Sequence, residues 1–211
     1  MDRDLFSDIR NFGRDHLRRS ETRVTTEDGR VWTEKQVGSE YCAEFKGYTW
    51  GYVVDEKPDL QVAVVLPGLI LASQDVAQDL NILKSNNITH ILNLAYGQPN
   101  QFCSYFVYKK LNVRDDPEEN IKLYFEECFN FIDAGLQNGC TLVHCNAGVS
   151  RAATIVIGYL MNRQKMTLKE ACQHVKNARS SIKPNNGFMK QLKEYETELY
   201  SNVLNNKELK N

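Results

Sequence analysis

Between residues 140 and 161 an apolar strand pattern runs into a short polar loop and then into a long apolar helix pattern. Residues 140–143 suit a buried strand, and residues 152–161 are apolar and long enough for a buried helix. The octet between them, residues 144–151, reads His-Cys-Asn-Ala-Gly-Val-Ser-Arg. A strand that turns directly into a buried helix predicts a sheet with helices packed on its faces.

The octet contains a cysteine and an arginine with five residues between them, Cys145 and Arg151. Backbone N–H groups of a loop at a helix N-terminus can form a nest that binds an anion such as phosphate. The same nest stabilises a thiolate at its centre, and the planar fork of an arginine can hold two phosphate oxygens. These residues therefore predict nucleophilic attack on a phosphate ester. The alternative is a buried structural cysteine beside an unrelated arginine.

Strand and helix patterns alternate along the chain from residue 61 onward. Their alternation predicts an α/β fold with a central, mostly parallel sheet flanked by helices. The octet then lies at the carboxyl end of a strand, where such sheets usually bind ligands. Strand patterns occur at 62–65, 69–71, 88–94, 105–113 and 140–143, and helix patterns at 75–85, 120–137, 152–161, from 167 and after 184.

Residues 1–60 differ in character from the rest of the chain. They are polar, and a possible short amphipathic helix near the start is followed by no regular core pattern. We therefore predict a polar, partly flexible extension over 1–60, a catalytic domain over 61–204 and a polar tail over 205–211. A basic cluster in the extension either docks an acidic partner or is simply a solvated face. The helix would use Leu5, Ile9, Phe12 and Leu17, and the basic cluster is Arg14, His16, Arg18, Arg19 and Arg23.

Composition narrows the class of protein. The 211 residues carry a net charge of −1, which does not favour nucleic-acid binding, and no run of 18 apolar residues suggests a membrane span. The six cysteines form no Cys-x-x-Cys pair and the four histidines are scattered, so we expect neither a metal nor a cofactor. An N-terminus without an apolar leader favours a reducing compartment, the cytoplasm first and the nucleus second.

Two aspartates are candidates for the proton donor that a phosphate monoester needs at its leaving oxygen. Asp115 and Asp116 follow a predicted strand, and a loop at that edge of the sheet can lie over the phosphate. The alternative is a solvated acidic turn.

Two residues of the octet have open roles beside the cysteine. His144 points to the opposite face of its strand from Cys145, so we expect it to bond backbone and orient the loop, or to be a plain core histidine. Ser150 either donates to the Cys145 sulfur or caps the following helix, and both roles can hold together.

The octet resembles the signature of the cysteine-based protein phosphatases, including Gly148 and Ser150. Three further stretches, at 69–73, 88–94 and 179–188, resemble the dual-specificity branch of that family. The likeness covers about 61–200 and is strongest to the small atypical members. The family more often has Gly where this chain has Ala72, and Ser where it has Ala152.

The resemblance implies a cysteine-phosphatase fold with the phosphate loop between a strand and a helix. Cys145 would be the nucleophile, Arg151 the phosphate clamp and Asp115 the acid, because the family's acid stands ten residues before a helical phenylalanine, here Phe125. Phosphate would be bound by Asn146, Ala147, Gly148, Val149, Ser150 and Arg151, with Ser150 also catalytic and with His144 and Asn185 as supporting residues.

By the same resemblance, the chain is expected to hydrolyse phosphotyrosine and phosphoserine or phosphothreonine in proteins through a phosphocysteine intermediate. Phosphorylated components of the stress-activated and mitogen-activated kinase cascades would be its partners. The absence of lysine between Cys145 and Arg151 argues against the branch that acts on inositol lipids. A second hypothesis is a scaffold that holds kinase components, with incidental turnover.

Overall fold

The computed structural model describes residues 22–25, 30–37, 40–48 and 58–208. The chain divides into two compact units, Met1–Val54 and Asp55–Asn211. The division falls a few residues before the boundary that we predicted after residue 60.

The first unit contains a three-stranded antiparallel sheet in the order β1-β2-β3. Its strands are β1 (Thr22–Thr25), β2 (Arg30–Val37) and β3 (Glu40–Tyr48). We expected no regular core pattern here and did not expect these strands. Residues 40–46 alternate polar residues with Tyr41, Ala43 and Phe45, which is a strand signal of period two. The predicted amphipathic helix lies outside the described residues, as does the basic cluster except for Arg23, which lies in β1.

The second unit is built on a five-stranded sheet in the order β4-β5-β8-β6-β7. β4 and β5 form an antiparallel hairpin, and every other neighbouring pair is parallel, which confirms the predicted mostly parallel sheet. The central strand is fully buried, as its unbroken apolar pattern predicts for a parallel strand covered on both faces. The strands are β4 (Ala63–Leu66), β5 (Leu69–Ala72), β6 (Ile88–Asn93), β7 (Val107–Lys110) and β8 (Cys140–His144).

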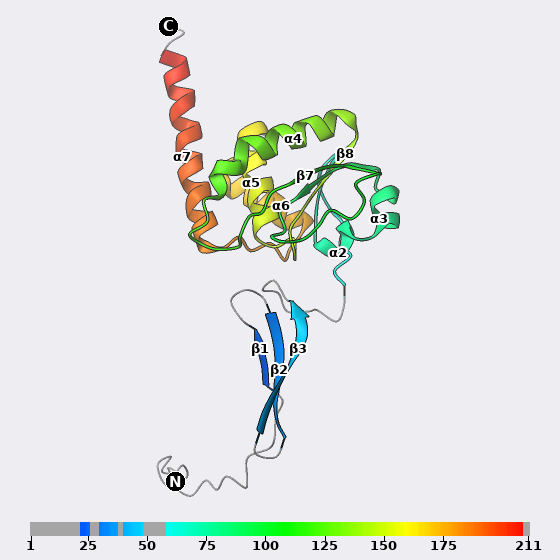
Figure 1. Cartoon of the computed structure of the whole chain (residues 1–211). Helices are drawn as coiled ribbons and strands as arrows, with labels where there is room; N and C mark the ends of the chain where they lie inside the picture. Colours follow the sequence, from blue (N-terminus) through cyan, green and yellow to red (C-terminus); the bar gives the residue numbers. More distant parts are fainter. Residues whose placement is uncertain (1–21, 26–29, 38–39, 49–57, 209–211) are drawn as a thin grey trace, which may run out of the picture. The chain divides into compact units, whose positions relative to one another are not determined.

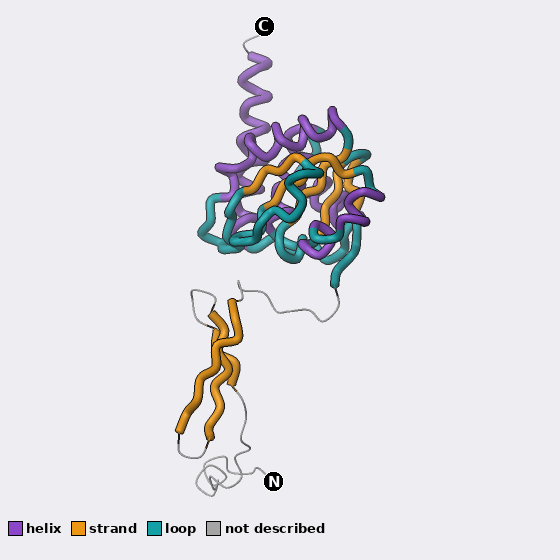
Figure 2. Tube along the Cα trace, turned by 45° about the vertical axis from the view of Figure 1, so that its right-hand side comes forward, coloured by secondary structure: helices purple, strands orange, loops and turns teal. Residues whose placement is uncertain are grey.

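Helices cover both faces of this sheet (Figures 1 and 2). On one face Ile91 and Leu142 pack against α2 (Gln74–Ala77) and α3 (Leu80–Ser85). On the other face Leu92 and Val143 pack against the four longer helices. These are α4 (Phe125–Asn138), which follows a 3₁₀ turn at Ile121–Tyr124, α5 (Arg151–Arg163), α6 (Leu168–Ala178) and α7 (Asn186–Glu208).

Two predicted elements differ from the structure in their bounds. The single helix expected over 75–85 is two helices, because the Asp79 carboxylate caps α3 by accepting from the N–H groups of Asn81 and Ile82. Residues 205–208 of the expected polar tail are the last residues of α7, which extends past the rest of the second unit in Figure 1.

The helix that follows the octet is buried all round. Every residue of α5 from Arg151 to Met161 is buried, as expected of a helix enclosed by other elements. β8 and α5 therefore hold the two ends of the octet within the core. None of the helices in the described part of the chain is long and apolar enough to cross a membrane.

Candidate active site

The loop that joins β8 to α5 will be called the phosphate loop, residues 145–150. Cys145 follows the last residue of β8 and is 1 % exposed. Gly148 has a φ of +64°, and a Cβ there would lie 2.3 Å from the carbonyl oxygen of Ala72. Only glycine fits, because the backbone is left-handed and passes directly over the end of β5.

The backbone carbonyls of the phosphate loop all point outward. Each carbonyl from residue 146 to residue 149 accepts a hydrogen bond from outside the loop. In loop order the donors are Gln74 N at 2.8 Å, Arg179 Nη2 at 2.9 Å, Arg179 Nε at 3.0 Å and Lys183 N at 2.8 Å. Across a planar trans peptide the next N–H points the opposite way, so the N–H groups of residues 147–150 face inward. Inward-facing N–H groups at the N-terminus of a helix are the geometry that anion-binding nests have.

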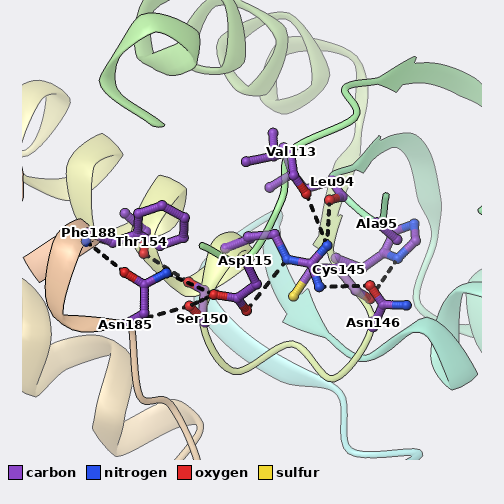
Figure 3. A network of polar contacts seen from close by, with 12 residues as sticks. Leu94, Ala95, Val113, Asp115, Cys145, Asn146, Ser150, Thr154, Asn185 and Phe188 are labelled. Atoms are coloured by element: carbon purple, nitrogen blue, oxygen red, sulfur yellow. Dashed lines mark hydrogen bonds and ion pairs between the residues drawn. The ribbon is translucent and has the colours of Figure 1, made fainter. Parts of the chain in front are cut away.

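Arg151 is fixed beside this nest by the ends of two other strands. Its side chain is 9 % exposed, and Nη1 donates to the carbonyls of Leu94 at 3.3 Å and Val113 at 3.1 Å. Nη2 donates to Asn146 Oδ1 at 2.7 Å (Figure 3). Among the described side chains, Arg151 Nε is one of two buried polar groups without a hydrogen-bond partner. A buried donor of this kind is costly, and an anion oxygen would satisfy it.

The structure brings Asp115 to the octet and leaves Asp116 outside. Asp115 Oδ1 accepts from Ser150 Oγ at 2.7 Å and from Asn185 Nδ2 at 2.9 Å (Figure 3). Asp115 Oδ2 lies 3.6 Å from Arg151 Nε. Asp116 instead closes its own turn, where Oδ1 accepts from Glu118 N at 2.9 Å. Of the two candidates, Asp115 is therefore the one that lies against Ser150 and Arg151.

Ser150 stands at the predicted N-cap position of α5, but its hydroxyl makes neither of the bonds that we predicted for it. Its hydroxyl donates to Asp115 and accepts from Asn185 N at 3.2 Å, and no side-chain capping bond is made at the start of α5. Its hydroxyl is used instead to hold the acidic loop, which reaches the octet from a different strand. Asn185 also caps the start of α7, because its Oδ1 accepts from Phe188 N at 2.9 Å.

His144 is buried beneath the phosphate loop at the end of β8. In the tautomer with its proton on Nδ1, the ring donates to the Cys145 carbonyl at 3.3 Å, which is the expected bond to backbone. Burial lowers the pKa of His144 to about 4, and the charge of Arg151 acts in the same direction. The ring is therefore neutral near pH 7 and is suited to orienting the loop.

One residue of the site was not predicted individually. Arg179 is completely buried and donates to the carbonyls of Ala147 and Gly148. The sequence marked it only as the first residue of a stretch that resembles the family. A single arginine at the end of a helix pattern carries no local signal of what it bonds.

Comparison with known proteins identifies the family. The model of the dual specificity phosphatase catalytic domain matches residues 69–198. The chain is 50% identical over 199 residues to mouse Dual specificity protein phosphatase 19, covering 92% of this chain and 90% of the relative. It is 45% identical over 135 residues to Arabidopsis thaliana Dual specificity protein phosphatase 1, covering 64% of this chain and 68% of the relative. The chain therefore belongs to the dual-specificity protein phosphatases, as its resemblance implied.

Solved structures agree with this assignment. The human tyrosine phosphatase-like serine/threonine/tyrosine-interacting protein matches with a TM-score of 0.64 and 37% identity, covering 66% of this chain and 97% of that one. A mouse putative dual specificity phosphatase complexed with zinc tungstate matches with a TM-score of 0.65 and 30% identity, covering 74% and 97%. The predicted fold and the predicted enzyme class, a protein-tyrosine/serine/threonine phosphatase, are both confirmed.

Proposed function

We propose that Cys145 attacks the phosphorus of phosphotyrosine, phosphoserine or phosphothreonine in proteins and forms a phosphocysteine. The observation that carries this proposal is the placing of Cys145 at the start of a loop with inward-facing N–H groups, with Arg151 and Asp115 paired at the other end of that loop. A P–S bond forms while the P–O bond to the leaving oxygen breaks, and Asp115 gives that oxygen its proton. Asp115 then takes a proton from water as the water attacks phosphorus, and the P–S bond breaks to release phosphate and the thiolate.

The proposed phosphate-binding role of Arg151 depends on which of its N–H donors are not already used by the protein. Arg151 Nη1 is held by two backbone carbonyls and one N–H of Nη2 is held by Asn146, which leaves Nε and the second N–H of Nη2 as the edge that can meet two phosphate oxygens. The N–H groups of the phosphate loop would bind the remaining charge, which increases in the transition state. Ser150 and Asn185 act through Asp115, because both bond the same carboxylate oxygen and leave Oδ2 turned towards Arg151.

Turnover of a small aryl phosphate, with and without EDTA, tests the proposed chemistry. Within the described residues no three His, Cys, Asp or Glu side chains are grouped as metal ligands. We expect equal phosphate release in both conditions and hydrolysis of both phosphotyrosyl and phosphoseryl peptides. Loss of activity with EDTA, or a folded protein without activity, would contradict the proposal.

Components of the stress-activated and mitogen-activated kinase cascades are the proposed substrates. The support is a relative named MAP kinase phosphatase with leucine-rich repeats protein 3 from Dictyostelium discoideum, 42% identical over 144 residues. That match covers 67% of this chain and 17% of the relative. A cysteine that must stay reduced to act suits the cytoplasm and the nucleus. Rates on doubly phosphorylated activation-loop peptides, compared with scrambled peptides, test the substrate class.

A scaffold that holds kinase components is the second candidate. The observation that favours it is the likeness to a human protein described as tyrosine phosphatase-like and as an interacting protein. Binding of a phosphorylated partner by a Cys145→Ser variant, together with a wild-type protein that turns over neither peptide, would favour the scaffold over the enzyme.

A further inference from the structure

A buried arginine links the phosphate loop to a segment that precedes the family's domain. Arg179 Nε and Nη2 donate to the carbonyls of Gly148 and Ala147, at 3.0 and 2.9 Å. Nη2 also donates to Asp59 Oδ2. Nη1 donates to the backbone carbonyl of Gln61 at 3.4 Å and to its Oε1 at 3.3 Å. Every nitrogen of the guanidinium is therefore used: two of these five hydrogen bonds go to the phosphate loop and three go to residues 59–61.

Asp59 is itself held firmly in place. Its N–H donates to Asp75 Oδ2 at 2.8 Å, and its carbonyl accepts from Ser73 Oγ at 2.6 Å. Its other carboxylate oxygen, Oδ1, accepts from Gln61 N at 3.1 Å. The family match covers residues 69–198, so Asp59 lies outside it.

The charge of Arg179 makes its partner important. A buried guanidinium without a counter-ion costs several kcal/mol, so Arg179 would move or draw in water if Asp59 lost its charge. The two peptide planes it holds, 147–148 and 148–149, would then lose their outward anchors. Their N–H groups belong to Gly148 and Val149, which face into the nest.

We propose that Asp59 is a positioning residue for the phosphate loop, acting through Arg179, and that residues 59–61 are part of the catalytic apparatus. The consequence for turnover rests on the proposed function, whereas the consequence for oxyanion binding does not. The alternative is an ion pair that only stabilises the fold. That alternative predicts a lower melting temperature with unchanged oxyanion affinity.

Asp59→Asn in the full chain is the first variant, with tungstate as the probe. The amide keeps the size of the carboxylate but turns one oxygen into a donor, so either the Arg179 bond or the Gln61 bond is lost. We expect tungstate to bind about 10-fold more weakly by calorimetry, and kcat/KM on an aryl phosphate to fall roughly 10- to 100-fold through the misplaced loop. Asp59→Glu, which keeps the charge, should recover part of both losses.

Asp79→Asn is the matched control. It makes the same chemical change at a carboxylate of the same unit, which caps α3 and has no contact with the phosphate loop. Its tungstate affinity should stay within about 2-fold of wild type, because the cost of a lost cap falls on stability.

Arg179→Lys covers the case in which Asp59→Asn does not fold. Lysine keeps a positive charge beside Asp59 but replaces the fork with one ammonium, which cannot reach both loop carbonyls. We expect a similar loss of tungstate affinity.

Wild-type tungstate affinity and turnover in Asp59→Asn and Arg179→Lys, whatever their melting temperatures, would overturn the positioning role. A wild type that binds tungstate more tightly than Asp59→Asn but turns over nothing would refute the proposed function and keep this inference. A wild type that neither binds tungstate nor turns over substrate would refute both.

Discussion

The phosphate loop and the acidic loop that carries Asp115 are held in different ways. The phosphate loop is anchored at its backbone, by donors from α2, from Arg179 and from the segment before α7. The acidic loop, residues 113–119, is largely exposed and is held by residues 185–191. In that segment Asn185 bonds Asp115, Gln191 Nε2 donates to the Glu119 carbonyl at 2.8 Å, and a Cβ at Gly187 would lie 1.9 Å from the Pro117 carbonyl oxygen.

This difference separates two tasks. Binding an oxyanion needs many donors that are oriented before the substrate arrives, and the whole fold orients them. Placing one proton donor needs only a few side-chain contacts. Substitution of a reacting group in either loop should therefore cause a large loss of turnover. Substitution of a residue that only holds the acidic loop should cause a smaller, partial loss.

The largest loss is expected for Cys145→Ser. Serine cannot supply a thiolate, so phosphate release should fall below detection. Tungstate should still bind, because none of the bonds that hold the loop carbonyls involves the sulfur. Phosphate release and tungstate calorimetry on the same preparation check both statements. An active Cys145→Ser enzyme would refute the nucleophile.

The next largest loss is expected for Asp115→Asn. Removing a positioned acid should slow turnover roughly 10²- to 10⁴-fold. The loss should be largest for phosphoserine, whose alkoxide cannot depart without a proton, and smallest for a nitrophenyl phosphate. Asp116→Asn is the control and should be mild, because Asp116 only closes its own turn. If Asp116→Asn causes the large loss of turnover and Asp115→Asn does not, the acid is Asp116 and our assignment of Asp115 is wrong.

Features formed by residues close together in the sequence could be predicted, whereas contacts between residues far apart in the sequence could not. β8, the octet and α5 were predicted because the chain passes directly from one to the next. The choice of Asp115 came from the family's spacing to Phe125, and the structure places Asp115 against Ser150 and Arg151. Arg179 and Asp59 stand 120 residues apart, and no local pattern pairs them.

The expectations that the structure did not meet concern the hydroxyl of Ser150 and the strands of the first unit. The hydroxyl of Ser150 was assigned to its sequence neighbours, but its partner arrives from an acidic loop 35 residues away. In the first unit β3 was not predicted, because the alternating Tyr41, Ala43 and Phe45 stand in a stretch of mostly polar residues.

A graded loss is expected for Asn185→Ala. It removes one of the two donors to Asp115 Oδ1 and leaves Ser150 in place, and it also removes the Asn185 cap of α7, whose cost falls on stability. The lost bond should reduce kcat about 3- to 10-fold on phosphoserine peptides, with a smaller effect on a nitrophenyl phosphate. Asn186→Ala, a change at the exposed neighbour, is the control. An equal loss on both substrates would mean that Asn185 acts on the phosphate loop and not through the acid.

The smallest effect on turnover, and the clearest effect on stability, is expected at His144. Its pKa is about 4 in the folded protein and 6.5 in a model peptide. Above pH 6.5 the ring is neutral in both states and adds no pH dependence. Between pH 6.5 and 4 the unfolded chain takes up a proton that the folded protein refuses, so the free energy of unfolding falls as the pH falls. The total loss from this residue is about 3 kcal/mol, and it levels off below pH 4.

Urea unfolding of wild type and His144→Asn between pH 7.5 and 4.5 measures this contribution. The pKa of His90 is also lowered by burial, so wild type alone cannot separate the two rings. The variant keeps His90, and the difference in unfolding free energy between the two proteins should shrink as the pH falls through this window. A difference that stays constant with pH would show that the ring takes up its proton equally in the folded and unfolded states, as a ring exposed to water does, and a difference that grows as the pH falls would show that the folded protein holds the ring protonated. In either case the phosphate loop would not be supported by a buried neutral ring. The contrast between a rigidly held phosphate loop and a more loosely held acidic loop would then be weakened.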